Sequence, residues 1–108
     1  MKVLDAIKKI EADIVNLSDG DREIITGYCG DFLSFVMGKA PQDCCWFTVM
    51  TNINVCAVAT LADVSLVVLC EGVAPSPELV EKCKTQGVNL AKTKHDVFEA
   101  VRRYLNEV

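Results

Sequence analysis

Ser65-Leu66-Val67-Val68-Leu69-Cys70 is the stretch that decides the fold of this 108-residue chain. It shows almost no alternation of polar and apolar residues, which is typical of a strand covered on both faces. Strands of that kind occur in parallel sheets whose two faces carry helices. The stretch therefore predicts a buried parallel strand inside an α/β protein.

The segments on either side of this strand alternate between helical and extended patterns. Strands are predicted near residues 14–17, 23–26, 45–50, 65–70 and 88–91, and helices near 2–11, 32–37, 55–62, 77–86 and 94–105. Strands that alternate with helices imply right-handed βαβ crossovers. The expected architecture is a three-layer α/β/α sandwich with a mostly parallel sheet of four to five strands.

Local signals set several element ends. Ser76 followed by Pro77 predicts a helix start, and Gly87 predicts the end of that helix. Asp31 is expected to cap a short helix that closes at Gly38.

Two further expectations concern the second strand and the last helix. The strand near residues 23–26 is expected to stop at Gly27. The last helix is expected to be amphipathic, with an apolar face of Val97, Phe98, Val101, Tyr104 and Leu105.

Composition limits the class of protein. At 11.8 kDa the chain is expected to form one domain over residues 1–108. Its net charge of −4 disfavours binding to a nucleic-acid backbone. It has no apolar run of membrane-spanning length and no signal-peptide pattern, so no membrane partner and a cytoplasmic location are expected.

The six cysteines form no C-x-x-C motif. They are interpreted as reduced, small core residues, because the chain lacks the character of a small secreted protein. His95 is the only histidine, so no metal site and no cofactor are expected. Cys29, which lies between Tyr28 and Gly30, is the thiol to test for reactivity, since a redox role for the cysteines remains a further alternative.

No catalytic constellation is recognisable. A Cys–His pair or a Ser–His–Asp set would have to use His95, which falls in the first turn of the last predicted helix. The sequence offers no paired carboxylates suited to acid–base work. We therefore expect a protein that is not an enzyme.

A ligand site is hypothesised at the carboxyl ends of the strands, where such folds commonly bind ligands. Two glycines let the backbone approach an anion, and nearby polar side chains would assist. The candidate ligand-binding residues are Arg22, Thr26, Gly27, Gly30, Asp31, Thr51 and Asn52. The alternative is a tight turn with an aspartate cap, with Arg22 tied to Asp21 or Asp31.

The segment Asp21 to Gly38 contains Asp21-Arg22, then Thr26-Gly27, and continues as Tyr28-Cys29-Gly30-Asp31-Phe32-Leu33-Ser34-Phe35-Val36-Met37. It resembles the DRTGG domain family, so the chain is identified as a single DRTGG-like domain. The resemblance implies a fold like the N-terminal domain of HPr kinase/phosphorylase and a regulatory or dimerisation role. Two positions depart from the family pattern: Tyr28 replaces the second glycine of the signature, and Phe35 stands where an acidic residue is common.

These observations favour a non-catalytic regulatory or scaffolding domain that acts as a homodimer. The hydrophobic content of 51% supports association, because apolar surface on a small chain favours a two-fold partner. The alternative is a sensor domain that binds a nucleotide or another small anion. No partner protein is identified by the sequence.

Overall fold

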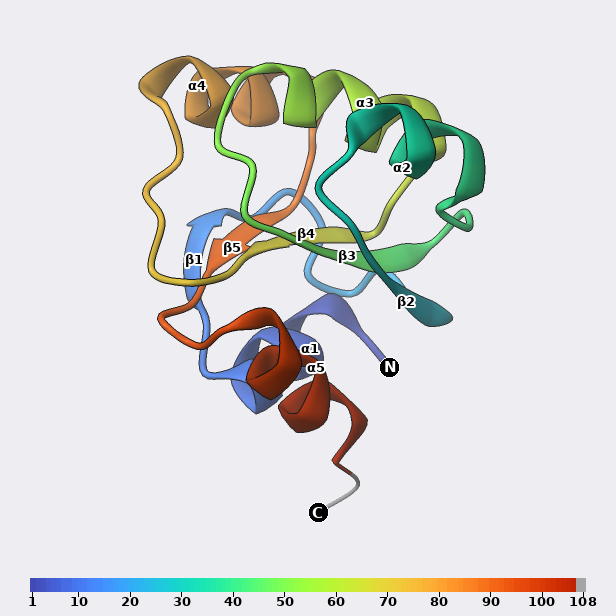
Figure 1. Cartoon of the computed structure of the whole chain (residues 1–108), viewed down its shortest axis with the longest axis vertical. Helices are drawn as coiled ribbons and strands as arrows, with labels where there is room; N and C mark the ends of the chain where they lie inside the picture. The colour runs from blue at the N-terminus through green and yellow to red at the C-terminus, as the bar shows by residue number, and fades with distance from the viewer. Residues whose placement is uncertain (107–108) are drawn as a thin grey trace.

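The computed structural model describes residues 1–106 as a central sheet with helices on both faces. Figure 1 shows α2, α3 and α4 above the sheet and α1 and α5 below it. The elements are α1 (Val3–Ile10), β1 (Asp13–Asn16), β2 (Thr26–Cys29), α2 (Leu33–Lys39), β3 (Cys44–Thr48), α3 (Asn54–Ala62), β4 (Leu66–Leu69), α4 (Pro77–Gln86), β5 (Leu90–Lys92) and α5 (Val97–Leu105). The predicted three-layer α/β/α sandwich is confirmed.

The sheet has five strands in the order β1-β5-β4-β3-β2. The strands β2 to β5 are parallel to one another, and only β1 runs antiparallel, beside β5. All four residues of β4, the middle strand, are buried. The prediction drawn from residues 65–70 is therefore confirmed.

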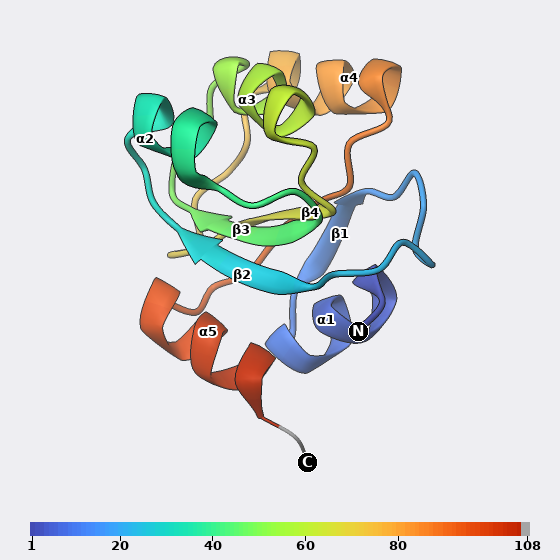
Figure 2. The ribbon, with the colours of Figure 1, turned by 90° about the vertical axis from the view of Figure 1, so that its right-hand side faces the viewer.

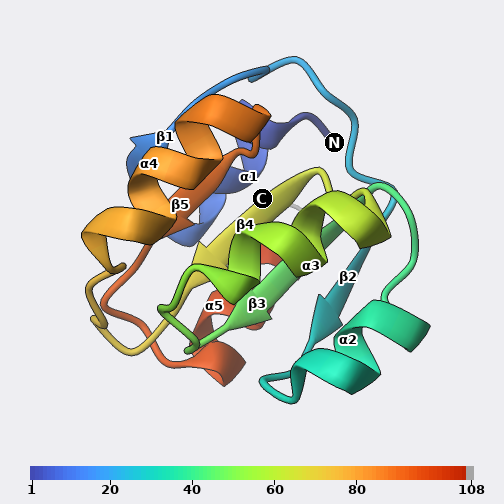
Figure 3. The same ribbon diagram turned by 90° about the horizontal axis from the view of Figure 1, so that it is seen from above.

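The parallel strands are wound in a single direction. Each step from β2 to β5 moves one position across the sheet, and the intervening helices α2, α3 and α4 lie over the same face (Figure 3). Ligand crevices in open α/β sheets form where the strand order reverses and helices diverge to opposite faces. The described parallel strands contain no such reversal, so this sheet creates no crevice of that kind.

An apolar core lies on each face of the sheet, between the sheet and the helices that cover that face. Trp46, Val67 and Leu69 point toward α2, α3 and α4, whereas Phe47 and Val68 point toward α1 and α5. This alternation follows the two-residue period of a strand. It explains why every residue of β4, and every residue of β3 before Thr48, is apolar.

The helix ends follow the local signals in part. The Ser76 hydroxyl accepts a hydrogen bond from the Leu79 N–H (3.1 Å), and Gly87 ends α4 at φ +71°, as predicted. The prediction for α2 was wrong at both ends. The helix begins after Phe32 with no side-chain cap, and Gly38 lies inside it.

Two further differences concern the second strand and the last helix. β2 spans Thr26–Cys29 and contains Gly27, because pairing with β3 continues through that glycine. In α5, Tyr104 is buried, but Phe98 is 80% exposed and Leu105 is 66% exposed. Phe98 and Leu105 therefore lie outside the part of α5 that the sheet covers. No helix of residues 1–106 has both the length and the apolar character needed to cross a bilayer.

Candidate functional site

The predicted ligand-binding residues lie in three separate places. Gly30, Asp31, Thr51 and Asn52 follow strands at the carboxyl ends, Arg22 precedes the amino ends, and Thr26 and Gly27 lie within β2. The structure therefore does not gather the seven residues into one site.

Asp31 holds the loop after β2 against the end of β3. Its Oδ1 accepts hydrogen bonds from the Thr48 hydroxyl and the Val49 N–H, both at 2.8 Å. The carbonyl oxygen of Gly30 accepts a bond from Trp46 Nε1, also at 2.8 Å. These contacts give Asp31 and Gly30 structural roles where the sequence suggested a ligand site or a helix cap.

Thr51 and Asn52 turn the chain from β3 into α3. The Thr51 carbonyl oxygen accepts a bond from the Ser76 N–H (3.0 Å), which ties this loop to the start of α4. Asn52 Oδ1 accepts a bond from the Asn54 N–H (2.9 Å). The Asn52 side chain is nevertheless exposed, so of the predicted set it is the one best placed to meet a ligand at the carboxyl ends.

Arg22 ties together the amino ends of three strands. Its Nη2 donates to Asp43 Oδ1 (2.9 Å), to Asp63 Oδ1 (2.8 Å) and to the Asp63 carbonyl oxygen (2.8 Å). Both aspartates have left-handed backbone conformations, with φ of +62° and +56°. The Arg22 hydrogen bond holds the pKa of the Asp63 carboxyl below its ordinary value. Arg22 is thus a structural clamp whose partners are neither Asp21 nor Asp31.

Thr26 and Gly27 line a groove between β2 and α5. The groove holds a cavity of about 230 Å³, bounded by Thr26, Gly27, Tyr28, Cys29, Phe47, Val101, Tyr104 and Leu105. None of these lining residues is charged. We call this cavity the β2–α5 groove.

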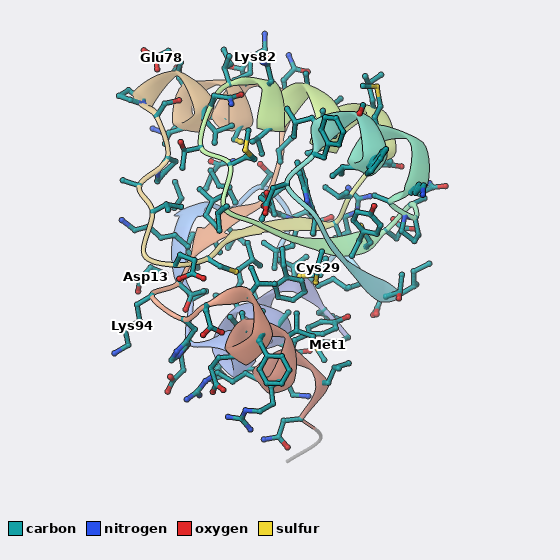
Figure 4. The ribbon with its side chains drawn as sticks, viewed as in Figure 1. Met1, Asp13, Cys29, Glu78, Lys82 and Lys94 are labelled. Carbon is teal, nitrogen blue, oxygen red and sulfur yellow. The ribbon has the colours of Figure 1, made fainter. Side chains whose placement is uncertain are left out.

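Two other surface cavities carry charged residues, and Figure 4 labels two residues of each. A cavity of about 150 Å³ beside the end of β5 is lined by Asp13, Gly72, Lys92, Thr93 and Lys94. A wider, shallow depression of about 570 Å³ along α4 is lined by Ile53, Pro77, Glu78, Glu81, Lys82 and Thr85. The first lies where the fold places carboxyl-end loops, and it holds two lysines that the sequence analysis did not select.

The cysteines behave mainly as core residues. Five are buried and only Cys29 is exposed. Burial raises the pKa of Cys44 to about 11 and that of Cys70 to about 12. Desolvation, together with the nearby charge of Asp31, also raises the pKa of Cys29. The accessible thiol is therefore not activated as a nucleophile.

His95 is part of a network of polar contacts that joins the end of α1 to α5. Its Nε2 lies 3.0 Å from Glu11 Oε1, and Arg103 Nη1 lies 3.1 Å from the same oxygen. The hydrogen bond to His95, followed by the charge of Arg103, lowers the pKa of Glu11. Within residues 1–106, no three His, Cys, Asp or Glu side chains are grouped to bind a metal.

The feature that sequence analysis missed is an apolar surface along the β2 edge of the sheet. Phe32 and Phe35, which follow β2 directly, are exposed by 64% and 54%, and Ile25, which precedes it, is exposed by 69%. Figure 2 looks onto this edge, with β2 in front, α2 above it and α5 below it. We call it the edge surface and define it by Ile25, Phe32, Phe35, Met37 and Leu105, together with β2.

A signal for this surface was present in the sequence. Five apolar residues were assigned to one face of the final helix, which is more than a helix beside the sheet edge can bury. The pair Phe32 and Phe35 on a short helix carried the same information. Neither signal could show that both helices flank the same edge strand.

The comparisons with known proteins find similarity among solved structures. No family model and no curated protein matches the chain. Among solved structures, the chain is similar to the CBS and DRTGG domains of the regulatory region of Clostridium perfringens pyrophosphatase, determined in complex with the activator diadenosine tetraphosphate.

That similarity is one of fold. The TM-score is 0.77 at 17% sequence identity, and the match covers 96% of this chain and 46% of the pyrophosphatase chain. The chain thus spans less than half the length of that structure. At the level of fold, the prediction of a DRTGG-like domain is confirmed.

Proposed function

We propose that this chain is a non-catalytic regulatory or scaffolding domain that acts as a homodimer, with two copies meeting at the edge surface. The observation that carries the proposal is the exposure of Phe32 and Phe35 on the segment that directly follows the edge strand β2. Large contiguous apolar patches on small proteins commonly mark interaction sites.

The edge strand itself favours a second copy as the partner. Within residues 1–106 no further strand pairs with the outer side of β2, so that side offers unpaired backbone groups. A two-fold axis perpendicular to the sheet would pair β2 with its copy in antiparallel fashion. The same axis would set α2 of one copy near α2 of the other, because α2 lies beside β2 (Figure 3).

Size and charge are compatible with this partner. A standard interface buries about 800 Å² per partner, which is roughly one seventh of the 5657 Å² that this chain exposes. Each copy carries a net charge of −4, so two copies repel unless they meet through uncharged surface. The β2–α5 groove, which has no charged lining residue, meets that requirement.

A regulatory role is supported by the similar solved structure and by the state of the His95 and Cys29 side chains in this chain. The structure with the same fold is described as a regulatory region of a pyrophosphatase. The two residues most relevant to nucleophilic catalysis are otherwise engaged or unactivated: His95 pairs with Glu11, and the Cys29 pKa is raised.

The homodimer is tested by the molar mass in solution. Light scattering from the purified chain should give twice the monomer mass of 11.8 kDa at high micromolar concentration. The variant Phe35→Ser should shift the equilibrium toward monomer. The control Ile14→Thr changes a half-exposed apolar residue at the opposite edge of the sheet and should leave the mass unchanged. A monomeric wild-type chain would contradict the proposal.

A second candidate function is binding of a small anion at the carboxyl ends of the strands. Two observations favour it: the structural neighbour was determined with a nucleotide activator, and Lys92 and Lys94 line a cavity at this end. A thermal-shift assay with diadenosine tetraphosphate tests it directly. Stabilisation that is lost in Lys94→Ala but kept in Lys82→Ala would support this site. No stabilisation at millimolar nucleotide would reject it.

A further inference from the structure

We propose that Cys56 and Cys83 form a reversible disulfide that joins α3 to α4. Both cysteines are buried, and both belong to the apolar core between the sheet and the helices α2, α3 and α4. The helices α3 and α4 lie side by side over that face of the sheet (Figures 1 and 3). A hydrogen bond joins the two cysteine side chains across the boundary between the helices. The fold therefore brings two thiols together on neighbouring helices.

The remaining four cysteines are kept apart from this pair by the fold. Cys45 and Cys70 lie in the core on the opposite face of the sheet. Cys44 points to the same face as the pair, but it lies at the amino end of β3, near Arg22, whereas α3 begins at the carboxyl ends of the strands. Cys29 lies on the edge strand β2. These four thiols therefore do not compete with the pair.

The hydrogen bond gives the two thiols different roles. Burial, followed by the charge and the hydrogen bond of Cys56, raises the pKa of Cys83 to about 12. A hydrogen bond that raises the pKa of an acid favours its protonated form, so Cys83 donates its S–H and the Cys56 sulfur accepts. Cys56 also lies in the first turn of α3, where a helix favours negative charge. We therefore assign Cys56 as the thiolate that reacts first.

Two features of α4 give an oxidant access to the pair. The depression of about 570 Å³ is lined by Ile53, one turn before Cys56, and otherwise by residues of α4, so it lies over the boundary between the two helices. In addition, α4 buries only Leu79 and Cys83. A helix with so few buried side chains can separate locally at less cost than global unfolding. The thiols are thus enclosed in the resting fold and become accessible by local opening of α4.

The oxidant is a low-molecular-weight disulfide, such as oxidised glutathione. The Cys56 thiolate attacks one sulfur of this disulfide, the bond between its two sulfurs breaks, and one glutathione leaves as a thiolate. The Cys83 sulfur then attacks the Cys56 sulfur and displaces the second glutathione. The two cysteines lose two electrons, and the oxidant gains them and becomes two thiols that take up the two cysteine protons. Reduced glutathione reverses both steps.

The test uses the variant Cys29→Ser, which removes the one exposed thiol and leaves five buried cysteines. After incubation with oxidised glutathione, the number of thiols titrated in the unfolded protein should fall by two, and the intact mass should fall by about 2 Da. Neither loss should occur when Cys56→Ala or Cys83→Ala is added. Cys83→Ala should instead trap one glutathione on Cys56. The matched control is Cys70→Ala, because Cys70 is equally buried and its pKa is also raised to about 12, yet this variant should still lose two thiols.

The disulfide should also raise the Tm by about 10 °C, because it restricts the unfolded chain. A protein that keeps all its thiols, or one that loses two of them equally with and without Cys56→Ala, would overturn the proposal. If the alanine variants do not fold, mass spectrometry of peptic peptides from the oxidised Cys29→Ser protein decides whether Cys56 is linked to Cys83. The inference goes beyond the proposed homodimer, since a monomeric chain should form the same disulfide.

Discussion

Replacing Arg22 with alanine should destabilise the protein without touching its apolar edge. Arg22 is the arginine of the signature that suggested a DRTGG-like domain, and it was a candidate ligand-binding residue. In the structure its side chain instead joins Asp43, the residue before β3, to Asp63, which lies three residues before the first residue of β4. The Arg22→Ala variant tests whether Arg22 stabilises the fold by holding the segments before β3 and β4 together.

The expected cost follows from the three hydrogen bonds of Nη2. Hydrogen bonds to charged groups contribute about 1.5–3 kcal/mol each when they are well shielded. Here the Arg22 side chain is 28% exposed and its two carboxylate partners are 39% and 51% exposed, so solvent screening reduces each contribution. We expect a loss of about 2 kcal/mol in the free energy of unfolding, or a fall in Tm of about 8 °C.

Thermal and urea unfolding followed by circular dichroism measure this loss, and pH adds a second readout. Asp63 has a lowered pKa in the folded state, so the clamp contributes fully above its ordinary value of 3.8 and is lost as the pH falls toward the folded-state pKa. The difference between wild type and Arg22→Ala should therefore be largest near neutral pH and should shrink below about pH 4. Lys82→Ala, which removes an exposed cation from α4, is the control. An unchanged unfolding midpoint for Arg22→Ala at pH 7 would refute the clamp.

Two further predictions concern the loop after β2 and the helix α5. Asp31→Ala should lower the free energy of unfolding by about 1–2 kcal/mol in urea titrations, because Thr48 and Val49 lose their shared acceptor. An unchanged free energy of unfolding would show that these hydrogen bonds do not stabilise the fold and would again favour a ligand-binding role for Asp31. Glu99 should titrate in NMR experiments with a pKa of about 2, since Arg102 hydrogen-bonds to its carboxylate, and Arg102→Ala should raise that pKa. A normal Glu99 pKa in the wild-type chain would show that the pair does not persist in solution.

Much of the fold could be predicted because its strongest signals are local. The unbroken apolar run of β4 and the Ser76–Pro77 start of α4 each depend on a few neighbouring residues, and both were located correctly. β2 was placed too early because Gly27 usually interrupts a strand. Here the pairing with β3 continues through the glycine, and no local pattern reports a pairing partner.

The candidate site could not be predicted in the same way, because it depends on which elements become neighbours. Arg22 was placed near Gly30 by its position in the chain, yet β2 separates the two residues at opposite ends of the sheet. The edge surface depends on α2 and α5 flanking the same edge strand, although more than fifty residues separate these helices. Strand order decides both arrangements, and the sequence pattern specifies only the types of element.

The most direct test of the interface is amide hydrogen–deuterium exchange at protein concentrations above and below self-association. The account predicts that concentration-dependent protection is confined to residues 25–37 and 97–105, which form β2 and the helices beside it. The segment 13–17, at the far edge of the sheet, should exchange at the same rate under both conditions. Protection centred on that far edge, or none at any concentration, would contradict an interface at β2.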